Sequence, residues 1–132
     1  MFSEFSAAAR AVITLAEQEC RNASHYYLGT EHLLLAMSIA PPADISEYFD
    51  QAGLKPWEVK RALREVMEPP SGHPWEGIIV TPRAQRVFSL AAAAKRSASV
   101  QPLDLLQAII ADGDGVAARV LKRLRESPLT RL

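Results

Sequence analysis

Apolar residues recur along the chain at steps of three and four, which is the spacing of one face of an α-helix. The segment 33–40 stands apart because none of its faces carries a charge, so we expect it to form a central, buried helix. Thr30 is predicted to be the N-cap of this helix, since its hydroxyl can accept a backbone N–H of the first turn. Glu31 then lies in that turn, where the helix dipole favours an anion.

The same periodicity returns between boundaries of proline and glycine. Pro41 and Pro42 end the central helix, and Gly53 is placed to end the next one in a left-handed C-cap. No run of alternating apolar residues predicts a strand. The predicted helices cover, in chain order, Ala9 to Cys20, Thr30 to Ala40, Ile45 to Ala52, Pro56 to Glu68, Pro82 to Ala91, Pro102 to Ile110 and Val116 to Leu124.

The two halves of the chain repeat each other. The pattern Ala-x-x-Val-x-x-Leu-Ala at 9–16 returns at 84–91, and Leu-Leu-x-Ala at 33–36 returns at 105–108. We therefore predict an all-α fold, a pseudo-two-fold bundle of two repeated four-helix units. The second unit is truncated to give about seven helices, because nothing after Glu126 matches the fourth predicted helix. The predicted single domain consists of repeat one at 1–68, a linker at 69–80, repeat two at 81–126 and a tail at 127–132.

Composition places the chain among ordinary globular proteins. Of its 132 residues, 48% are hydrophobic and 23% are charged, and a chain of this length can bury a core without metal or disulfide. The single cysteine, Cys20, cannot form an internal disulfide, and the sequence has no basic leader and no long apolar span. We therefore expect a cytoplasmic protein with Cys20 in the helical core.

The charges balance overall but not along the chain. Fifteen basic and fifteen acidic residues cancel, so there is no general electrostatic reason to expect nucleic acid or a membrane as partner. Residues 1–58 carry eight acids and three bases, a balance of −5, whereas residues 59–132 carry seven acids and twelve bases, a balance of +5. This asymmetry either orients a partner or a second copy, or it reflects two ordinary solvated surfaces.

The motifs of enzymes and metal sites are missing from the sequence. It contains no Gly-x-x-x-x-Gly-Lys-Ser/Thr phosphate loop, and the run from Asp112 to Gly115 lacks the ligand spacing of a calcium loop. Cys20, His25 and His32 fit no standard zinc spacing, and no strand-turn-helix elbow presents a serine nucleophile. His32 is instead expected to be neutral and hydrogen-bonded in the core. We predict no catalytic residue, no metal and no cofactor.

The remaining candidate site is a polar rim made by helix starts. Ser6 and Thr30 each begin a predicted helix, whose free backbone N–H groups can receive an anion. Glu31 can hold a cationic group beside them, so a ligand with both charges would suit this rim. The alternative is that Ser6 only caps its helix and Glu31 only complements its own helix dipole.

Three motifs give the chain a specific resemblance. Leu-Gly-Thr-Glu-His-Leu-Leu-Leu at 28–35, Val-Thr-Pro-Arg-Ala at 80–84 and Asp-Gly-Asp-Gly-Val-Ala-Ala-Arg-Val-Leu at 112–121 resemble the double-repeat N-terminal domain of Clp ATPases, of the ClpC type. The resemblance extends from residue 1 to about residue 125. It implies a mobile recognition module, here without AAA+ modules, that binds and does not catalyse.

The resemblance also implies partners. They would be a Clp-family AAA+ unfoldase, its adaptors, or client proteins and peptides destined for proteolysis. The domain would then recognise substrates or adaptors and assist the unfoldase. In the alternative it is a decoy or regulator that competes with a Clp unfoldase for ligands, or sequesters small molecules that target the N domain of the unfoldase.

Some domains of this type recognise phosphoarginine, which assigns roles to individual residues. The resemblance implies that Glu31 faces the guanidinium, with Ser6 and Thr30 near the phosphate. In the second repeat Leu103 stands where the glutamate would be, so a second phosphoarginine site is not expected.

Aromatic residues suggest a separate apolar surface for partners. Phe2 and Phe5 lie at an otherwise polar terminus, where they either join a binding surface or anchor the core. The truncated second repeat leaves apolar surface near Trp75 or Leu121, unless the tail or another subunit covers it.

Overall fold

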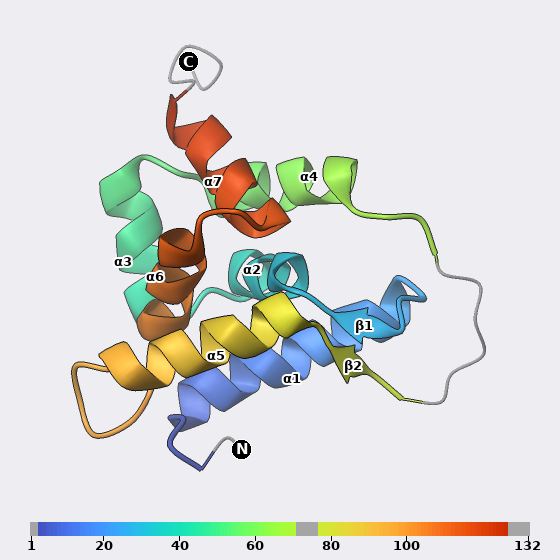
Figure 1. Ribbon diagram of the computed structural model, residues 1–132. Helices are drawn as coiled ribbons and strands as arrows, with labels where there is room; N and C mark the ends of the chain where they lie inside the picture. The colour runs from blue at the N-terminus through green and yellow to red at the C-terminus, as the bar shows by residue number, and fades with distance from the viewer. Residues whose placement is uncertain (1–2, 71–76, 127–132) are drawn as a thin grey trace.

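The computed structural model describes residues 3–70 and 77–126, which form a helical bundle (Figure 1). The all-α prediction is confirmed, and the seven predicted helices are present in the described residues. They are α1 (Ala7–Asn22), α2 (Thr30–Ile39), α3 (Ala43–Ala52), α4 (Pro56–Val66), α5 (Pro82–Ala94), α6 (Pro102–Asp112) and α7 (Val116–Glu126), with two short strands, β1 (Tyr27–Leu28) and β2 (Ile79–Val80).

The α2 helix lies at the centre of the bundle, as its uncharged sequence predicts (Figure 1). Helices α1, α4, α5 and α7 all pack against it. Thr30 and every residue from His32 to Ser38 are buried, whereas Glu31 is only partly covered. The first turn of α2 therefore brings Glu31 to the edge of the core. None of the described helices has the length and apolar character needed to span a membrane.

The N-cap of α2 differs from the prediction. Gly29 is the N-cap and Thr30 is the first helical residue, so the Thr30 hydroxyl does not cap the helix. The reason is His32, whose side chain accepts a hydrogen bond from the backbone N–H of Gly29 at 3.0 Å. The imidazole of His32, in the first turn of α2, thus satisfies the backbone N–H of the N-cap residue. By contrast, the hydroxyls of Ser6 and Thr81 cap α1 and α5 by accepting hydrogen bonds from the backbone N–H groups of Ala9 and Ala84.

The two strands were not predicted, because a pair of residues is too short to show an alternating pattern. They are parallel, with Tyr27 opposite Ile79 and Leu28 opposite Val80. Thr81 at the start of α5 donates its backbone N–H to the carbonyl of Leu28, just before α2. This pairing sets the start of α5 beside the start of α2.

A second parallel backbone contact joins the starts of α1 and α6. Phe5 and Val100 form an isolated parallel bridge, and Ser6 donates its backbone N–H to the carbonyl of Val100 at 2.9 Å. Val100 lies just before α6, so the start of α1 is set beside the start of α6. Each of these four helix starts therefore pairs with one from the other half of the chain, which is the arrangement that a pseudo-two-fold repeat predicts.

Candidate binding site at paired helix starts

Thr30, Arg83 and Gly115 meet where α2 and α5 begin. A Cβ atom placed on Gly115 would lie 2.8 Å from Cδ of Arg83 and 3.0 Å from the Thr30 hydroxyl. Because those distances are shorter than ordinary van der Waals contact, a larger residue at position 115 would require the Arg83 side chain to move. The Arg83 guanidinium forms an ion pair with Asp112 at 2.5 Å, so the cation is held in place at the start of α5.

Ser6 is not part of this site. It lies at the N-terminal end of α1, whereas β1 and the start of α2 follow the C-terminal end of that helix (Figure 1). The 16 residues of α1 span about 24 Å at the usual helical rise. The structure therefore brings Thr30 and Glu31 together but places Ser6 at the start of α6, which corrects the expectation of a single rim. From repeat two, Gly115 and the Arg83 side chain lie near Thr30 instead, since a Cβ atom on Gly115 would lie 2.8 Å from Cδ of Arg83 and 3.0 Å from the Thr30 hydroxyl.

The Glu31 carboxylate folds back over Gly29. A Cβ atom on Gly29 would lie 2.3 Å from Oε1 of Glu31, so only glycine leaves the carboxylate room in this position. Burial raises the pKa of Glu31, while a hydrogen bond to its own backbone and the nearby His25 act in the opposite direction. Among the described residues, Glu31 forms no ion pair within 4.0 Å. A partly covered carboxylate of this kind favours a cationic ligand.

A chain of hydrogen bonds through two histidines fixes the start of α2. The backbone N–H of Gly29 donates to Nδ1 of His32, so the other ring nitrogen of His32, Nε2, carries the proton. That Nε2 lies 2.8 Å from Nδ1 of His25, which must accept. His25 then donates from Nε2 to the carbonyl of Glu68 at 2.8 Å. The chain is complete only when both rings are neutral and in these tautomers.

The surroundings of His32 favour its neutral state. His32 is fully buried, and burial, followed by the proximity of His25, lowers the pKa of His32 to about 4. Tyr27 stacks on His25 with ring centroids 5.2 Å apart and meets His32 edge-on at 5.1 Å. The expectation of a neutral, hydrogen-bonded His32 is confirmed. The histidine pair therefore holds Gly29, and with it the position of Glu31.

At the start of α6, the counterpart in repeat two, two backbone N–H groups already donate to side chains of this chain. Leu103 stands where Glu31 stands in repeat one, and its backbone N–H donates to Oδ2 of Asp44 at 2.9 Å. Asp104 accepts from the backbone N–H of Gln101, so a second donor of this start is also satisfied. This geometry agrees with the expectation that only the first repeat keeps a site.

The predicted apolar partner surface is not formed by Phe5. Its side chain is 4% exposed and packs edge-on against Phe88, with ring centroids 5.9 Å apart. Phe5 therefore anchors the core, which was the alternative, and the assignment of Phe5 to an exposed surface is wrong. Phe2 and Trp75, the other members of that proposed surface, lie outside the described residues.

The described residues hold no group of three or more histidine, cysteine or acidic side chains that could bind a metal ion. Cys20 is completely buried in the core, and burial, with Glu31 as the next cause, raises its pKa to about 12. Its thiol is therefore protonated and screened from solvent, as expected for a core residue.

Comparison with known proteins identifies the family. The family profile described as "Clp repeat (R) N-terminal domain" matches residues 4–124, so the chain belongs to the Clp N-terminal repeat family. A relative among curated proteins is "Chaperone protein ClpC, chloroplastic" from Pisum sativum, 30% identical over 131 residues. The match covers 97% of this chain but only 14% of the chaperone, so the chain spans a small part of that protein's length.

Two solved structures share the fold. The N-terminal domain of Hsp104 from Candida albicans has a TM-score of 0.77 at 19% identity, covering 92% of this chain and 81% of the other. A ClpV N-domain in complex with a VipB peptide has a TM-score of 0.73 at 19% identity, covering 95% and 82%. These likenesses support the helical repeat architecture described above.

Proposed function

We propose that this domain is a recognition module that binds protein or peptide ligands for a Clp-family AAA+ unfoldase, acting on substrates or adaptors of that system. Its membership of the Clp N-terminal repeat family supports this class of function. So does the ClpV N-domain, a related fold that was solved with a VipB peptide. The domain itself performs no chemistry in this proposal.

The observation that carries the proposal is the Glu31 carboxylate. It is partly buried, lacks an ion-pair partner among the described residues, and is held in place by Gly29 and the histidine pair. Partial burial of a carboxylate costs free energy, and the hydrogen bond to its own backbone offsets only part of this cost, since the pKa of Glu31 stays raised; a bound cation would offset more of it. A ligand guanidinium or ammonium would supply that cation.

Phosphoarginine is the ligand group that suits the surroundings of Glu31. Its guanidinium would pair with Glu31, and its phosphate would lie toward Arg83 and the neighbouring start of α5. The Arg83 side chain and the Thr30 hydroxyl lie 2.8 Å and 3.0 Å from the same point, the Cβ position of Gly115. In this arrangement Thr30 and Glu31 contribute to the site, whereas Ser6 does not.

Calorimetric titration with a phosphoarginine peptide tests this proposal. We expect saturable binding with one site per chain, and binding at least tenfold weaker in Glu31→Gln, because a charge-assisted hydrogen bond contributes about 1.5–3 kcal/mol. The matched control is Glu47→Gln on α3, an exposed carboxylate that should leave the affinity unchanged. Unmodified arginine in the same peptide should bind more weakly than phosphoarginine.

Two results would contradict the proposed ligand. If the two variants bind equally, Glu31 does not contact the ligand, and if the unmodified peptide binds as well, the phosphate is not recognised. Ser6→Ala adds a further control, because the geometry places Ser6 at the other end of α1 and predicts no effect on affinity.

The role of the module in degradation is tested separately. Added to a working Clp unfoldase and protease, an adaptor should speed degradation of a bound client. A decoy that competes for the same ligands should slow it, and the effect should be lost in Glu31→Gln if the ligand is held at this site. No change in rate at saturating domain concentration would contradict both roles.

A further inference from the structure

The α7 helix carries an unusual excess of unpaired positive charge. It has four basic side chains and one acidic one, and all four basic residues are exposed. Among the described residues none of the four takes part in an ion pair within 4.0 Å. Arg83 and Arg86 of α5, in contrast, both lie within 4.0 Å of Asp112. The basic residues of α7 are Arg119, Lys122, Arg123 and Arg125.

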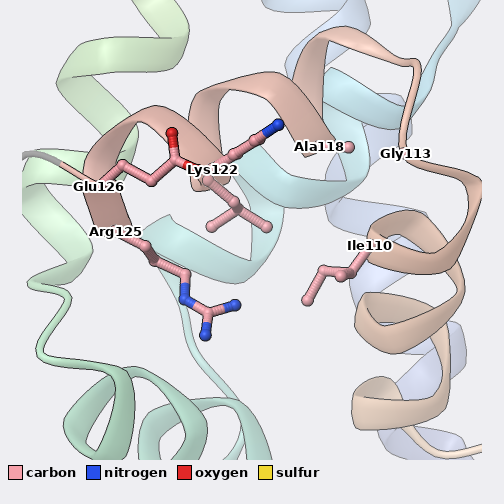
Figure 2. Close-up of a pocket in the computed structure, with 7 residues that line it drawn as sticks. Ile110, Gly113, Ala118, Lys122, Arg125 and Glu126 are labelled. Carbon is pink, nitrogen blue, oxygen red and sulfur yellow. The ribbon is translucent and has the colours of Figure 1, made fainter.

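One side of α7 borders a hollow shared with α6. The hollow has a volume of about 430 Å³, and its apolar floor is formed by Ile110, Ala118 and Leu121. Lys122 and Arg125 line its rim, together with Glu126. Figure 2 shows Ile110 and Arg125 reaching toward this space from the two helices. An aliphatic side chain placed here would meet an apolar floor and a basic edge.

The other side of α7 borders a second hollow, shared with α4. Its volume is about 260 Å³, and its floor consists of three valines, Val66, Val116 and Val120. Val66 is 40% exposed, so apolar surface remains open to a partner here. Arg119 and Arg123 line the rim. The helix is therefore flanked by two hollows, each with an apolar floor and two basic side chains on its rim, and the first also has Glu126 there.

We propose that the two flanks of α7 form a docking surface for an acidic amphipathic segment of a partner protein. Aliphatic side chains of the segment would fill the hollows, and its carboxylates would pair with the four basic side chains. Charge complementarity identifies the occupant, because the exposed surface of α7 is basic and lacks intramolecular counter-charges among the described residues. The surface does not include Thr30, Glu31 or Arg83, so this inference is independent of the proposed function.

Other occupants match this chemistry less well. Residues 127–132 follow α7 in the sequence, but they contain Arg131 and no acidic side chain, so their charge does not complement the rim. A nucleic acid would suit the basic residues but would leave the apolar floors unfilled, and neither hollow is lined by an aromatic side chain on which a base could stack. A second copy of the chain remains as an outcome that the experiment separates.

The experiment uses a fluorescent helical peptide of about 16 residues, with leucines at i, i+3, i+4 and i+7 spacing and glutamates elsewhere. Its affinity for the full chain is measured by anisotropy. A peptide with lysine in place of every glutamate is the charge control, and a single-stranded oligonucleotide represents nucleic acid. We expect the glutamate peptide to bind, the lysine peptide to fail, and added salt to weaken binding.

Two sets of variants locate the surface. The combined R119Q, K122Q, R123Q and R125Q variant should lower the peptide affinity about tenfold, since each exposed charge pair contributes a few tenths of a kcal/mol or more. The matched control replaces four exposed basic residues elsewhere, R10Q, K55Q, K60Q and R61Q, and should change the affinity less than about twofold. Val66→Ser should also weaken binding, because it removes apolar floor without altering charge.

Several results would overturn the proposal. These are absence of peptide binding, equal binding of the lysine peptide, and equal loss of affinity in the two four-residue variants. An oligonucleotide that binds more tightly than the glutamate peptide and displaces it would assign the surface to nucleic acid instead. Light scattering that shows a dimer in the wild type and a monomer in the α7 variant would assign it to a second copy. Circular dichroism confirms that each variant is folded.

Discussion

Acidification should destabilise the fold through His32. The buried ring is neutral, and its pKa of about 4 lies below the value of about 6.5 for an exposed histidine. As the pH falls, the unfolded chain therefore binds a proton at this residue before the folded chain does. Stability should decrease between about pH 6.5 and pH 4 and should level off, for this residue, below that window.

The size of the effect follows from the two pKa values. A difference of about 2.5 units corresponds to about 3 kcal/mol of differential stability at 1.36 kcal/mol per unit. Since native domains are stable by only about 5–15 kcal/mol, this loss would be a large part of the total. Glu31 acts in the opposite direction, because its raised pKa favours protonation of the folded form as the pH falls.

Urea denaturation across this pH range measures the effect, with His32→Gln as the reference. At neutral pH the variant should be less stable by about 1–3 kcal/mol, because Gly29 and His25 lose a fully matched hydrogen-bond partner. Between pH 7 and pH 4 it should lose about 3 kcal/mol less than the wild type, since the other titrating groups are common to both proteins. Parallel stability curves for the two proteins would refute the reasoning.

Three further predictions concern single residues. Gly29→Ala should change stability by less than about 1 kcal/mol in urea, but it should weaken phosphoarginine-peptide binding about as much as Glu31→Gln does. A methyl group at position 29 would displace the flexible Glu31 carboxylate, whose Oε1 lies 2.3 Å from the Cβ position, and unchanged binding would contradict this. Gly113→Ala should lower the thermal stability by about 1 kcal/mol, since Gly113 ends α6 at φ +76°, and an unchanged melting temperature would count against it. Cys20 should resist a thiol reagent in the folded protein and react in urea, whereas rapid native labelling would contradict its complete burial.

The helices could be predicted from the sequence because their signals are local. Periodic apolar positions, prolines at helix starts and glycines after helix ends all act within a few residues of one another. The prediction that α2 is central also succeeded, because a segment without a charged face cannot lie on a surface. Glu31 was selected through its motif at a helix start; the structure shows it partly buried there, and its role in binding a ligand stays a prediction.

The pairing of helix starts could not be predicted in the same way. The pairing of α2 with α5 depends on the parallel contact between β1 and β2, in which Leu28 lies opposite Val80. Each strand has only two residues, so it leaves no pattern in the sequence. For this reason Ser6 was grouped with Thr30 and Glu31, although the structure places Arg83 there instead. The sequence shows that several helices begin with similar capping residues, but it does not show which of these helix starts are neighbours in the fold.

The hydrogen-bond chain at the start of α2 was also beyond local inference. His25 reaches the carbonyl of Glu68, which is 43 residues away in the chain, and only the packed fold brings the two together. The same limit applies to Phe5, whose burial depends on its contact with Phe88 of the other repeat. The choice of Gly29 over Thr30 as N-cap follows from the rotamer of His32, which sequence does not specify.

The most direct test of the central claim is NMR mapping of a phosphoarginine-peptide titration on the backbone amides of the full chain. We expect shift changes concentrated at Gly29 to Glu31 and at Arg83, with little change at Ser6 and Leu103. Changes concentrated at the starts of α1 and α6, or no change at saturating peptide, would contradict the assignment of a ligand site to the paired starts of α2 and α5.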